Sequence, residues 1–558
     1  MAKKLFHASA LALTTLCLLM TGCNKQSSTN SDGSSEEPIV INRPDFTPDY
    51  ENYEVNASPV GVNIGYYSDI YSRGFSWLTD TETNDTELYL VKSDKGEKAD
   101  FSGAQLVSGT SVEVTYAQGG KFSSNDQANL PDYTNSSKVS SSTADTTCLA
   151  HKVHVENLEK GKAYSYKIGS SAGYKYGAFV VEKEQPKSIT AVQVSDAQTK
   201  DADKHNIWRN TLVKAVETAG SGLDTIFHNG DQFDQNMGKV HSSDSKSPSR
   251  ILRYAKALDV VQDYTFNIPY MASSGNHEET APYIQYVMND VNYAGYDKKG
   301  AYYSYDYSFA HFVVLNTNIV EEANVDTDAQ INWLKNDLEA AKNAKWKIVL
   351  LHIAPYSTGD HSDNSENQKI VEKLTPIFSE KHVDLVLQAH DHTYNKTLPY
   401  RWDAAGYTTT WNNIDVVNFE PETETKDGVT YDKNPQGTYY VTTGAAGHRQ
   451  GASESDGIWA EVVNDNGEWK GLNPSKTFLS NKYKIELGKL KYENEYEPYT
   501  FSSYTSDQHY EVGDLSTGNV NSPMFGVLDL NETTMSYKVY TANGSEVKLF
   551  DSLDVLKS

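Results

Sequence analysis

The stretch that most narrows the fold is LVLQAHDHTYNKT, from Leu385 to Thr397, in which an aliphatic run ends at two histidines. The run predicts a buried strand, and alternate side chains of a strand share a face. His390 and His392 are therefore expected to point at one object, with Asp391 pointing away. A metal ion is one such object, and a pair of solvated loop histidines is the alternative.

Other apolar runs between residues 186 and 451 also stop at residues of the kinds that bind metals. In chain order, VSDAQ carries Asp196, HNGDQFD carries Asp231 and Asp234, SSGNHEET carries Asn276 and His277, and VLLHIAPYSTGDH carries His352 and His361. A constellation of this kind is more specific than a single histidine pair.

Helical periods separate these runs, as expected for an α/β region. The first, DKHNIWRNTLVKAVETAG, places Trp208, Leu212, Ala215 and Val216 on one face. Two others, DAQINWLKNDLEAAKNA and NQKIVEKLTPIFSEK, lead directly into the runs that contain His352 and His390.

The flanking regions are richer in strands. Short alternating segments from Asn52 to Val181, such as TSVEVTYAQ and AYSYKIGS, predict a β-sandwich. Strands return after Gly437, where Asn543-Gly544 is expected to be the two-residue turn of a hairpin. Residues 452–522 form a polar, Tyr-rich insertion without a predicted structure.

The formal charge of -26 and the pI near 5.0 argue against a broad nucleic-acid-binding or anionic-membrane-binding surface. No nucleic-acid-binding surface is evident. An acidic protein that handles phosphate must produce its positive potential locally, and metal ions would do so.

The N-terminus resembles an export signal. Residues 1–23 combine Lys3 and Lys4 with an apolar run and end in LLMTGC, which resembles a bacterial lipobox with Cys23 as the lipidated residue. Residues 24–48 are then a flexible tether. We therefore expect a secreted, membrane-anchored lipoprotein on the extracytoplasmic side of a bacterial cell envelope. Cys148 would be the one cysteine left unmodified, which excludes an intramolecular disulfide.

Carboxylate, amide and imidazole ligands together suit divalent metals such as Zn, Mn or Fe. The set is large enough for two ions that share a bridging carboxylate. Two such ions would hold a hydroxide and bind the oxygens of a phosphoryl group.

At this point the motifs resemble a known family, the metallophosphoesterases (calcineurin-like phosphoesterases), and within it the purple-acid-phosphatase-like branch. The family motifs D-x-G, G-D-x-x-Y, G-N-H-[ED], V-x-x-H and G-H-x-H correspond to DAQ, GDQFD, GNHE, VLLH and AHDH. The resemblance implies an N-terminal fibronectin-III-like β-sandwich over residues 49–185. It also implies an α/β metallophosphoesterase sandwich, with two mixed β-sheets flanked by helices, over residues 186–451, completed by C-terminal strands from 523–558.

The resemblance also implies roles for single residues. Asp231 would bridge two divalent or trivalent metal ions (Fe, Zn or Mn). Asp196 and His392 would bind one ion, and Asn276, His352 and His390 the other. His277 and His361 would contact the substrate, and Glu278 would orient the ring of His277.

Two positions depart from the family. Asp234 stands where the purple branch has the tyrosine that binds ferric iron, so iron is not implied; Asp234 either binds a metal in its place or bonds nearby backbone. Gln198 stands where the branch has glycine, and is either a weak ligand or a hydrogen-bonding neighbour. For His361, a solvated loop histidine is the alternative.

The expected activity is acid-phosphatase-like hydrolysis of small phosphate monoesters by a hydroxide at a binuclear metal centre. The alternatives are a phosphodiesterase or nucleotidase, and a surface binding protein whose phosphoesterase site has decayed.

Overall fold

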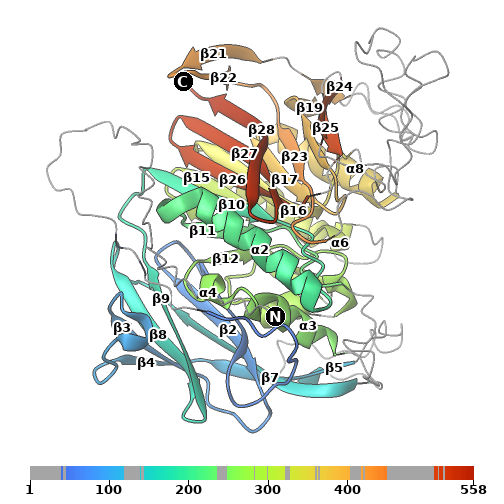
Figure 1. Ribbon diagram of the computed structural model, residues 1–558. Helices are drawn as coiled ribbons and strands as arrows, with labels where there is room; N and C mark the ends of the chain where they lie inside the picture. The colour runs from blue at the N-terminus through green and yellow to red at the C-terminus, as the bar shows by residue number, and fades with distance from the viewer. Residues whose placement is uncertain are drawn as a thin grey trace, which may run out of the picture. The chain divides into compact units, whose positions relative to one another are not determined.

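Two β-sheets form the framework of the chain after residue 186 (Figure 1). The first has eight strands, in which β10, β11 and β12 are parallel and β26 lies antiparallel beside β10. Their order is β12 (Tyr270–Ala272), β11 (Thr225–His228), β10 (Ser188–Val194), β26 (Met524–Asn531), β27 (Thr534–Asn543), β28 (Glu546–Leu556), β22 (Val429–Lys433) and β21 (Glu422–Lys426).

The second sheet has nine strands, and β15, β16, β17 and β23 run parallel within it. Their order is β13 (Gly295–Asp297), β14 (Gly300–Tyr307), β15 (Ala310–Val314), β16 (Trp346–Ile353), β17 (Leu385–Ala389), β23 (Tyr439–Thr443), β18 (Tyr394–Thr397), β25 (Leu515–Asn519) and β24 (Gln508–Val512). A further pair joins β19 (Tyr400–Trp402) to β20 (Val416–Asn418).

The inner faces of the two sheets share one hydrophobic core, which includes Phe227, Phe312, Ile348, Leu387 and Leu528. Because both sheets are also covered by helices, their central strands are apolar on both faces, as the continuous aliphatic runs predicted. The predicted architecture of two mixed sheets with flanking helices is confirmed.

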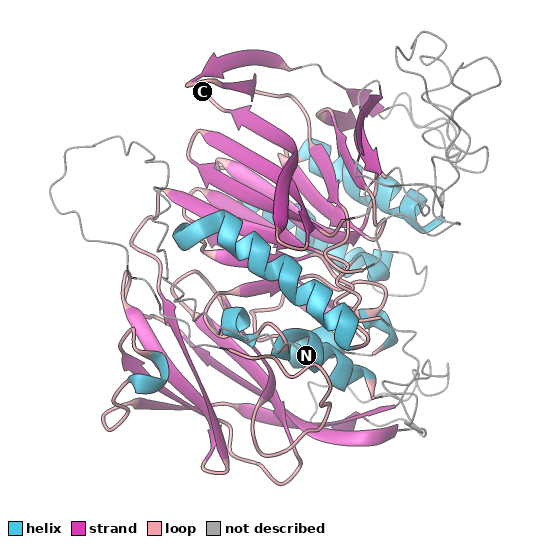
Figure 2. Ribbon diagram, in the orientation of Figure 1, coloured by secondary structure: helices cyan, strands magenta, loops and turns pink. Residues whose placement is uncertain are grey.

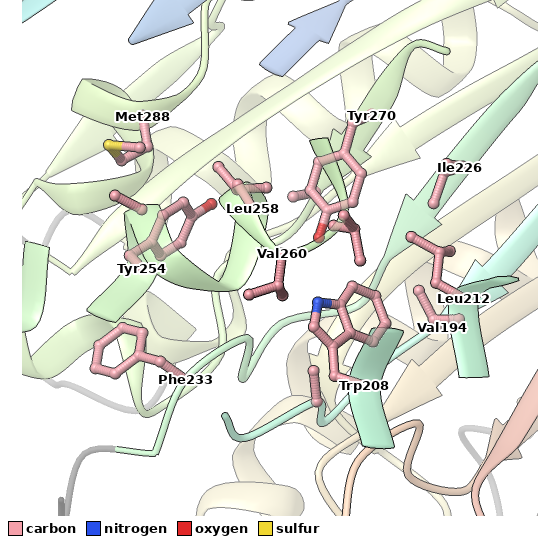
Figure 3. Close-up of a cluster of buried hydrophobic side chains, with 14 of the residues drawn as sticks. Val194, Trp208, Leu212, Ile226, Phe233, Tyr254, Leu258, Val260, Tyr270 and Met288 are labelled. Atoms are coloured by element: carbon pink, nitrogen blue, oxygen red, sulfur yellow. The ribbon is translucent and has the colours of Figure 1, made fainter. Parts of the chain in front are cut away.

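Helix α2 (Ala202–Ala219) packs on the first sheet and lies over β10 and β26 (Figure 1). Asp201 caps its N-terminus by accepting a hydrogen bond from the backbone N–H of Lys204 at 3.1 Å. Its buried face includes Trp208 and Leu212, as predicted (Figure 3). The indole N–H of Trp208 donates to the carbonyl of Ala257 at 2.8 Å, which ties α2 to the neighbouring helix.

The remaining helices are shorter or lie on the other sheet. α7 (Thr327–Ala340) and α8 (Ser365–Glu380) share a core with β16 and β17 through residues such as Leu334 and Leu374. The others are α3 (Arg250–Asp259), α4 (Gln262–Thr265), α5 (Ile284–Met288), α6 (Thr317–Val320) and the single turns η3 (Gly220–Gly222) and η4 (Glu278–Thr280).

The N-terminal part consists of two sheets around a core that includes Phe75, Trp77 and Tyr166. Its described residues contain one helical turn, η1 (Gly96–Lys98), as Figure 2 shows. One sheet has the order β1 (Val60–Gly65), β2 (Arg73–Thr79), β7 (Ala144–Val155), β5 (Thr110–Ala117), β6 (Lys138–Val139); the other has β4 (Gln105–Ser108), β3 (Glu87–Lys92), β8 (Ala163–Ser170), β9 (Gly173–Val180). The fibronectin-III-like identity of this part stays a prediction.

One hairpin differs from its prediction by one residue. Asn543 pairs with Glu546, so the two turn residues are Gly544 and Ser545 rather than Asn543 and Gly544. Gly544 has φ +59°, the left-handed conformation that this turn requires and that glycine adopts without strain.

The computed structural model describes residues 39, 41, 46–117, 138–139, 144–234, 248–281, 283–297, 299–320, 327–357, 361, 365–402, 416–418, 421–448, 508–512, 515–519 and 522–558. The expected signal sequence, Cys23, most of the tether and most of 452–522 lie outside these residues. Among them, Cys148 is buried and unpaired, and no described helix has the length and apolarity needed to cross a bilayer.

Candidate metal centre

The predicted ligands gather where strands of the two sheets end. Asp196 follows β10, Asp231 follows β11 and Asn276 follows β12. From the second sheet, His352 lies near the end of β16, and His390 follows β17. The carboxyl ends of parallel strands are where α/β folds commonly build their sites, because loop residues from neighbouring strands meet there.

Asp231 lies at the middle of this group. One carboxylate oxygen, Oδ1, is 3.3 Å from Nε2 of His352 and accepts the backbone N–H of His277 at 2.9 Å. The other, Oδ2, accepts a hydrogen bond from the amide of Gln198 at 3.1 Å and is 3.6 Å from Nε2 of His277. The carboxylate of Asp231 therefore faces two sets of side chains.

The first set contains Asp196, His392 and Gln198. Nε2 of His392 is 3.5 Å from Oδ1 of Asp196 and 3.2 Å from Nε2 of Gln198. Gln198 thus lies between Asp231 and His392. A sequence reading alone left open whether its amide is a ligand or a neighbour; here it forms a hydrogen bond to the central carboxylate.

The second set contains His352, Asn276 and His390. Nε2 of His352 is 3.0 Å from the amide oxygen of Asn276, and its Nδ1 is 2.7 Å from the backbone carbonyl of Asn229. The rings of His352 and His390 are 5.1 Å apart between centroids. Ligand atoms of Asp231, His352 and His390 all lie within 4.8 Å of one another, close enough to bind one ion.

Several buried atoms of these side chains have no hydrogen-bond partner among the described residues. They are Oδ1 of Asp196, Oε1 of Gln198 and Nε2 of His390. Buried polar atoms are almost always paired, and a site for a cation is one of the established reasons for an exception. Oxygen and neutral nitrogen donors suit divalent ions, so the residues fit the metals that their types predicted.

Charge within the group favours the metal-binding forms of Asp231 and His390. Burial would raise the pKa of Asp231, but the neighbouring His277 and His352 hold that pKa well below the usual range. Burial, together with His361 and His352, keeps the pKa of His390 well below its usual value, so its imidazole is neutral. An ionised carboxylate and a neutral imidazole are the protonation states required of metal ligands. His352 differs, because despite its burial the carboxylates of Asp231 and Asp196 raise its pKa to about 10, so this ring must lose a proton when it binds a metal.

Three of the predicted ligands have backbone conformations that are uncommon outside glycine. The φ angles are +50° for Asp196, +56° for Asp231 and +74° for His390. Asp, Asn and His adopt the left-handed region more readily than most residues, and such strain gathers at functional sites. The strained backbone re-aims each side chain just after its strand ends.

The expected geometry of the histidine pair is wrong. β17 ends at Ala389, and His390 and His392 lie on a tight turn rather than on a strand. In this turn the N–H of Asp391 donates to the carbonyl of Ala389 at 2.9 Å, and the N–H of Thr393 donates to the carbonyl of Asp391 at 2.7 Å. The left-handed conformation of His390 interrupts the two-residue alternation.

The expected role of Glu278 is also wrong. Nδ1 of His277 is 3.1 Å from the carbonyl of Phe233, so Glu278 does not hold that nitrogen. The carboxylate of Glu278 instead accepts backbone N–H groups of Asp231 at 2.7 Å, Gln232 at 2.8 Å and Gly275 at 2.8 Å. Glu278 therefore stabilises the two loops that carry Asp231 and Asn276, because three backbone N–H groups of these loops donate hydrogen bonds to its buried carboxylate.

His361 is held at the edge of the group. Its ring lies 4.0 Å from the ring of His390 between centroids, and Nδ1 is 2.8 Å from Oδ1 of Asp391. Its side chain is 38% exposed, compared with 0% for His352 and 12% for His392. These contacts argue against a freely solvated loop histidine.

Asp234 has a cationic neighbour. Its Oδ2 is 3.4 Å from Nζ of Lys200, and Arg253 donates to its backbone carbonyl at 3.4 Å. A carboxylate that is partly neutralised by lysine is a poorer ligand than one that faces only neutral groups. The assignment of Asp234 as a metal ligand stays a prediction.

Asn229 was not predicted from the sequence. It is fully buried, and its amide nitrogen donates to the carbonyls of Leu351 at 3.0 Å and Leu387 at 2.7 Å. Its amide oxygen accepts from Gln193 at 3.2 Å. Asn229, the residue after β11 of the first sheet, therefore links that strand to β16 and β17 of the second, and its backbone carbonyl contacts the ring of His352. The only sequence signal is its place in HNGD, one residue before a glycine with φ +89°.

Residues 190–394 match the calcineurin-like phosphoesterase family. This part of the chain is a calcineurin-like phosphoesterase (metallophosphoesterase) domain. The relatives that the chain resembles include acid phosphatases and purple acid phosphatases. Mouse (Mus musculus) acid phosphatase type 7 is 25% identical over 315 residues, which are 53% of this chain and 64% of that protein. Arabidopsis thaliana purple acid phosphatase 21 is 27% identical over 199 residues, 33% of this chain and 37% of that protein.

A purple acid phosphatase from yellow lupin (Lupinus luteus) seeds has a similar fold. It is 14% identical, has a TM-score of 0.56, and the match covers 90% of this chain and 75% of that one. The chain thus spans somewhat less than two thirds of the mouse protein and shares its framework with the lupin enzyme. A calcineurin-like phosphoesterase domain implies a binuclear metal centre, for which the structure brings Asp231, His352 and His390 together.

Proposed function

We propose that this protein hydrolyses phosphate monoesters at a binuclear metal centre. The observation that carries the proposal is the convergence of Asp231, His352 and His390, all buried, with ligand atoms within 4.8 Å. The unpaired atoms of Asp196 and His390 give it further support, because each is a buried donor atom of a kind that metals take.

The two sets of side chains on either side of Asp231 correspond to two ions. Asp196 and His392 would hold one ion, and Asn276, His352 and His390 the other, with Asp231 between them. When bound, such ions neutralise the charge on phosphoryl oxygens and lower the pKa of the attacking water. Ferric iron with a tyrosine ligand is not expected, because Asp234 occupies that position.

The remaining residues have roles that need no direct bond to an ion. Nε2 of His277, which is 3.6 Å from Oδ2 of Asp231, would donate a hydrogen bond to a phosphoryl oxygen. His361, which is partly exposed and has its ring 4.0 Å from that of His390 between centroids, would assist the leaving group. Glu278 keeps the Asp231 and Asn276 loops in register.

The test compares wild type with Asp231→Asn. Hydrolysis of p-nitrophenyl phosphate and of bis(p-nitrophenyl) phosphate is measured after reconstitution with Zn, Mn and Fe in turn. We expect the monoester to be the faster substrate and Asp231→Asn to lose at least about 100-fold, a loss typical of removing a catalytic element. A variant as active as wild type would refute the mechanism. A faster diester would favour the phosphodiesterase or nucleotidase alternative.

A surface binding protein with a decayed site is the rival from a different functional class. Metal analysis separates the two: two equivalents in reconstituted wild type support the enzyme, while less than one equivalent, with no hydrolysis of either ester, supports the rival. The convergence of the six predicted ligands favours the enzyme.

We further propose that the protein is a lipoprotein anchored at Cys23 outside the cytoplasm, with the N-terminal sandwich as a fibronectin-III-like domain. The sequence LLMTGC supports the anchor. Wild type should incorporate labelled palmitate and sediment with membranes, and Cys23→Ser should do neither. Equal incorporation by both proteins would contradict this assignment.

A further inference from the structure

Asp391 lies between two predicted metal ligands, but its carboxylate is directed to a third histidine. It is buried, with 2% of its surface exposed, and Oδ1 accepts both the backbone N–H of His361 at 3.0 Å and the ring Nδ1 at 2.8 Å. One oxygen therefore fixes both the main chain of His361 and the rotation of its ring. A contact to the main chain or to the ring alone would leave the other free to move.

The ring of His361 is restrained on a second side by His390, whose ring centroid is 4.0 Å away at a tilt of 38°. With Nδ1 bonded to Asp391, the other polar atom of the ring is Nε2. The His361 side chain is 38% exposed, and is therefore more exposed than the side chains of His352 and His392. Substrate would reach the site from this exposed side, and Nε2 is the ring nitrogen at the end away from Asp391.

We propose that Asp391 is a positioning residue that holds His361 with Nε2 directed at the leaving oxygen of the phosphate ester. The inference rests on the proposed phosphomonoesterase activity. In the reaction, the oxygen of water bonds to phosphorus while the bond from phosphorus to the ester oxygen breaks. The ester oxygen keeps the bonding electron pair, accepts a hydrogen bond from Nε2–H of the His361 imidazolium, whose Nδ1–H is bonded to Asp391, and leaves as an alcohol after it gains the proton that the water loses. The sum is ester plus water giving alcohol plus phosphate.

A hydrogen bond to the leaving oxygen matters most when that oxygen carries much charge in the transition state. Alkyl leaving groups are more basic than p-nitrophenolate and need this stabilisation more. The effect of losing Asp391 should therefore depend on the leaving group, whereas general damage to the metal centre would slow all esters alike.

The experiment measures kcat/KM for p-nitrophenyl phosphate and for an alkyl phosphate, glycerol 2-phosphate, in reconstituted wild type, Asp391→Ala, His361→Ala and the double variant. Asp391→Ala should lose about 100-fold on glycerol 2-phosphate, within the range for removing a positioned donor, and less than about 5-fold on p-nitrophenyl phosphate. The double variant should be no more than about 3-fold slower than His361→Ala, because both substitutions remove the same interaction.

Two controls separate positioning from folding and from charge. Asp94→Ala removes an exposed aspartate of the N-terminal sandwich and should change neither rate. Asp391→Asn keeps an oxygen that can accept both His361 bonds, so it should recover glycerol 2-phosphate hydrolysis to within about 10-fold of wild type. Metal content and the melting temperature, Tm, are measured for every variant.

Several results would overturn the inference. They are an equal loss on both esters, additive losses in the double variant, an Asp391→Asn variant as slow as Asp391→Ala, or metal loss in Asp391→Ala that accounts for its slowness. If wild type hydrolyses no ester, the proposed activity itself fails. The positioning of His361 is then decided by ring-nitrogen NMR shifts in protein labelled with ¹⁵N-histidine, which must change for His361 in Asp391→Ala and must not change in Asp94→Ala.

Discussion

Replacing Asn229 with alanine should destabilise the fold and weaken metal binding together. The amide of Asn229 makes three buried hydrogen bonds, to Leu351, Leu387 and Gln193. A neutral hydrogen bond contributes about 1 kcal/mol net, and leaving buried partners unsatisfied adds to the loss. After allowing for the second hydrogen bond that a strand carbonyl can keep, the expected loss is about 2–4 kcal/mol of unfolding free energy.

The assay is urea unfolding at constant pH, with metal content measured on the same samples. Asn210→Ala is the matched control, because the side-chain amide of Asn210 donates one exposed hydrogen bond, to the carbonyl of Gly544 at 3.1 Å. This substitution should cost less than about 0.5 kcal/mol. Asn229→Asp should be worse than Asn229→Ala, since a carboxylate would face two carbonyl oxygens. If Asn229→Ala is as stable as the Asn210 control, or if Asn229→Asp is more stable than Asn229→Ala, then the hydrogen bonds of Asn229 do not link the two sheets as we infer.

Three further outcomes are expected. Gly275→Ala should lower the free energy of unfolding by about 2–3 kcal/mol and abolish ester hydrolysis, because an added Cβ would collide with Asp231. In the control variant Gly103→Ala the added Cβ meets open space, so the Tm should stay as in wild type. Equal Tm values for the two variants would contradict this prediction. His311 bonds Asp306 and Asp337, and despite its burial these bonds raise the pKa of His311 to about 9. The charged His311 contributes about 1–2 kcal/mol to the free energy of unfolding, after discounting for the exposed Asp306; this contribution is present below pH 6.5 and lost as the pH rises through 9. The free energies of unfolding at pH 6 and pH 9.5 should therefore differ more in wild type than in His311→Gln. An equal difference in the two proteins would contradict this assignment. Removing metal with a chelator should lower Tm and abolish hydrolysis, both restored by added Zn or Mn, because an ion at 100 times its Kd stabilises the fold by about 2.7 kcal/mol; an unchanged Tm would argue against a bound ion.

The sequence predicted those features that depend on local order. The period of Trp208 and Leu212 predicted the buried face of α2, and apolar runs that stop at Asp196, Asp231 and His352 predicted which strand ends carry the site. Both patterns are set by neighbours along the chain, which is why periodicity detects them.

Features that depend on groups far apart in the sequence were either not predicted or predicted incorrectly. Glu278 was predicted to be the partner of His277, which precedes it in the chain, but the carboxylate of Glu278 accepts hydrogen bonds from the backbone N–H groups of Asp231 and Gln232. The two bonds from Asp391 to His361 join residues 30 apart, and no local pattern indicates them. Such contacts exist only after the sheets pack, so spacing alone carries no trace of them.

The pairing of β10 with β26 fixes when the site can form during synthesis. β10 ends two residues before Asp196, yet its antiparallel partner lies more than 320 residues later, between Met524 and Asn531. Until that segment leaves the ribosome, β10 has an open edge and the first sheet lacks its centre. A growing chain would therefore have little affinity for metal at Asp196, and the binding pocket would close only after residues 524–531 have left the ribosome. Metal binding at Asp196 is thereby coupled to the folding of β26, a strand that is synthesised long after β10.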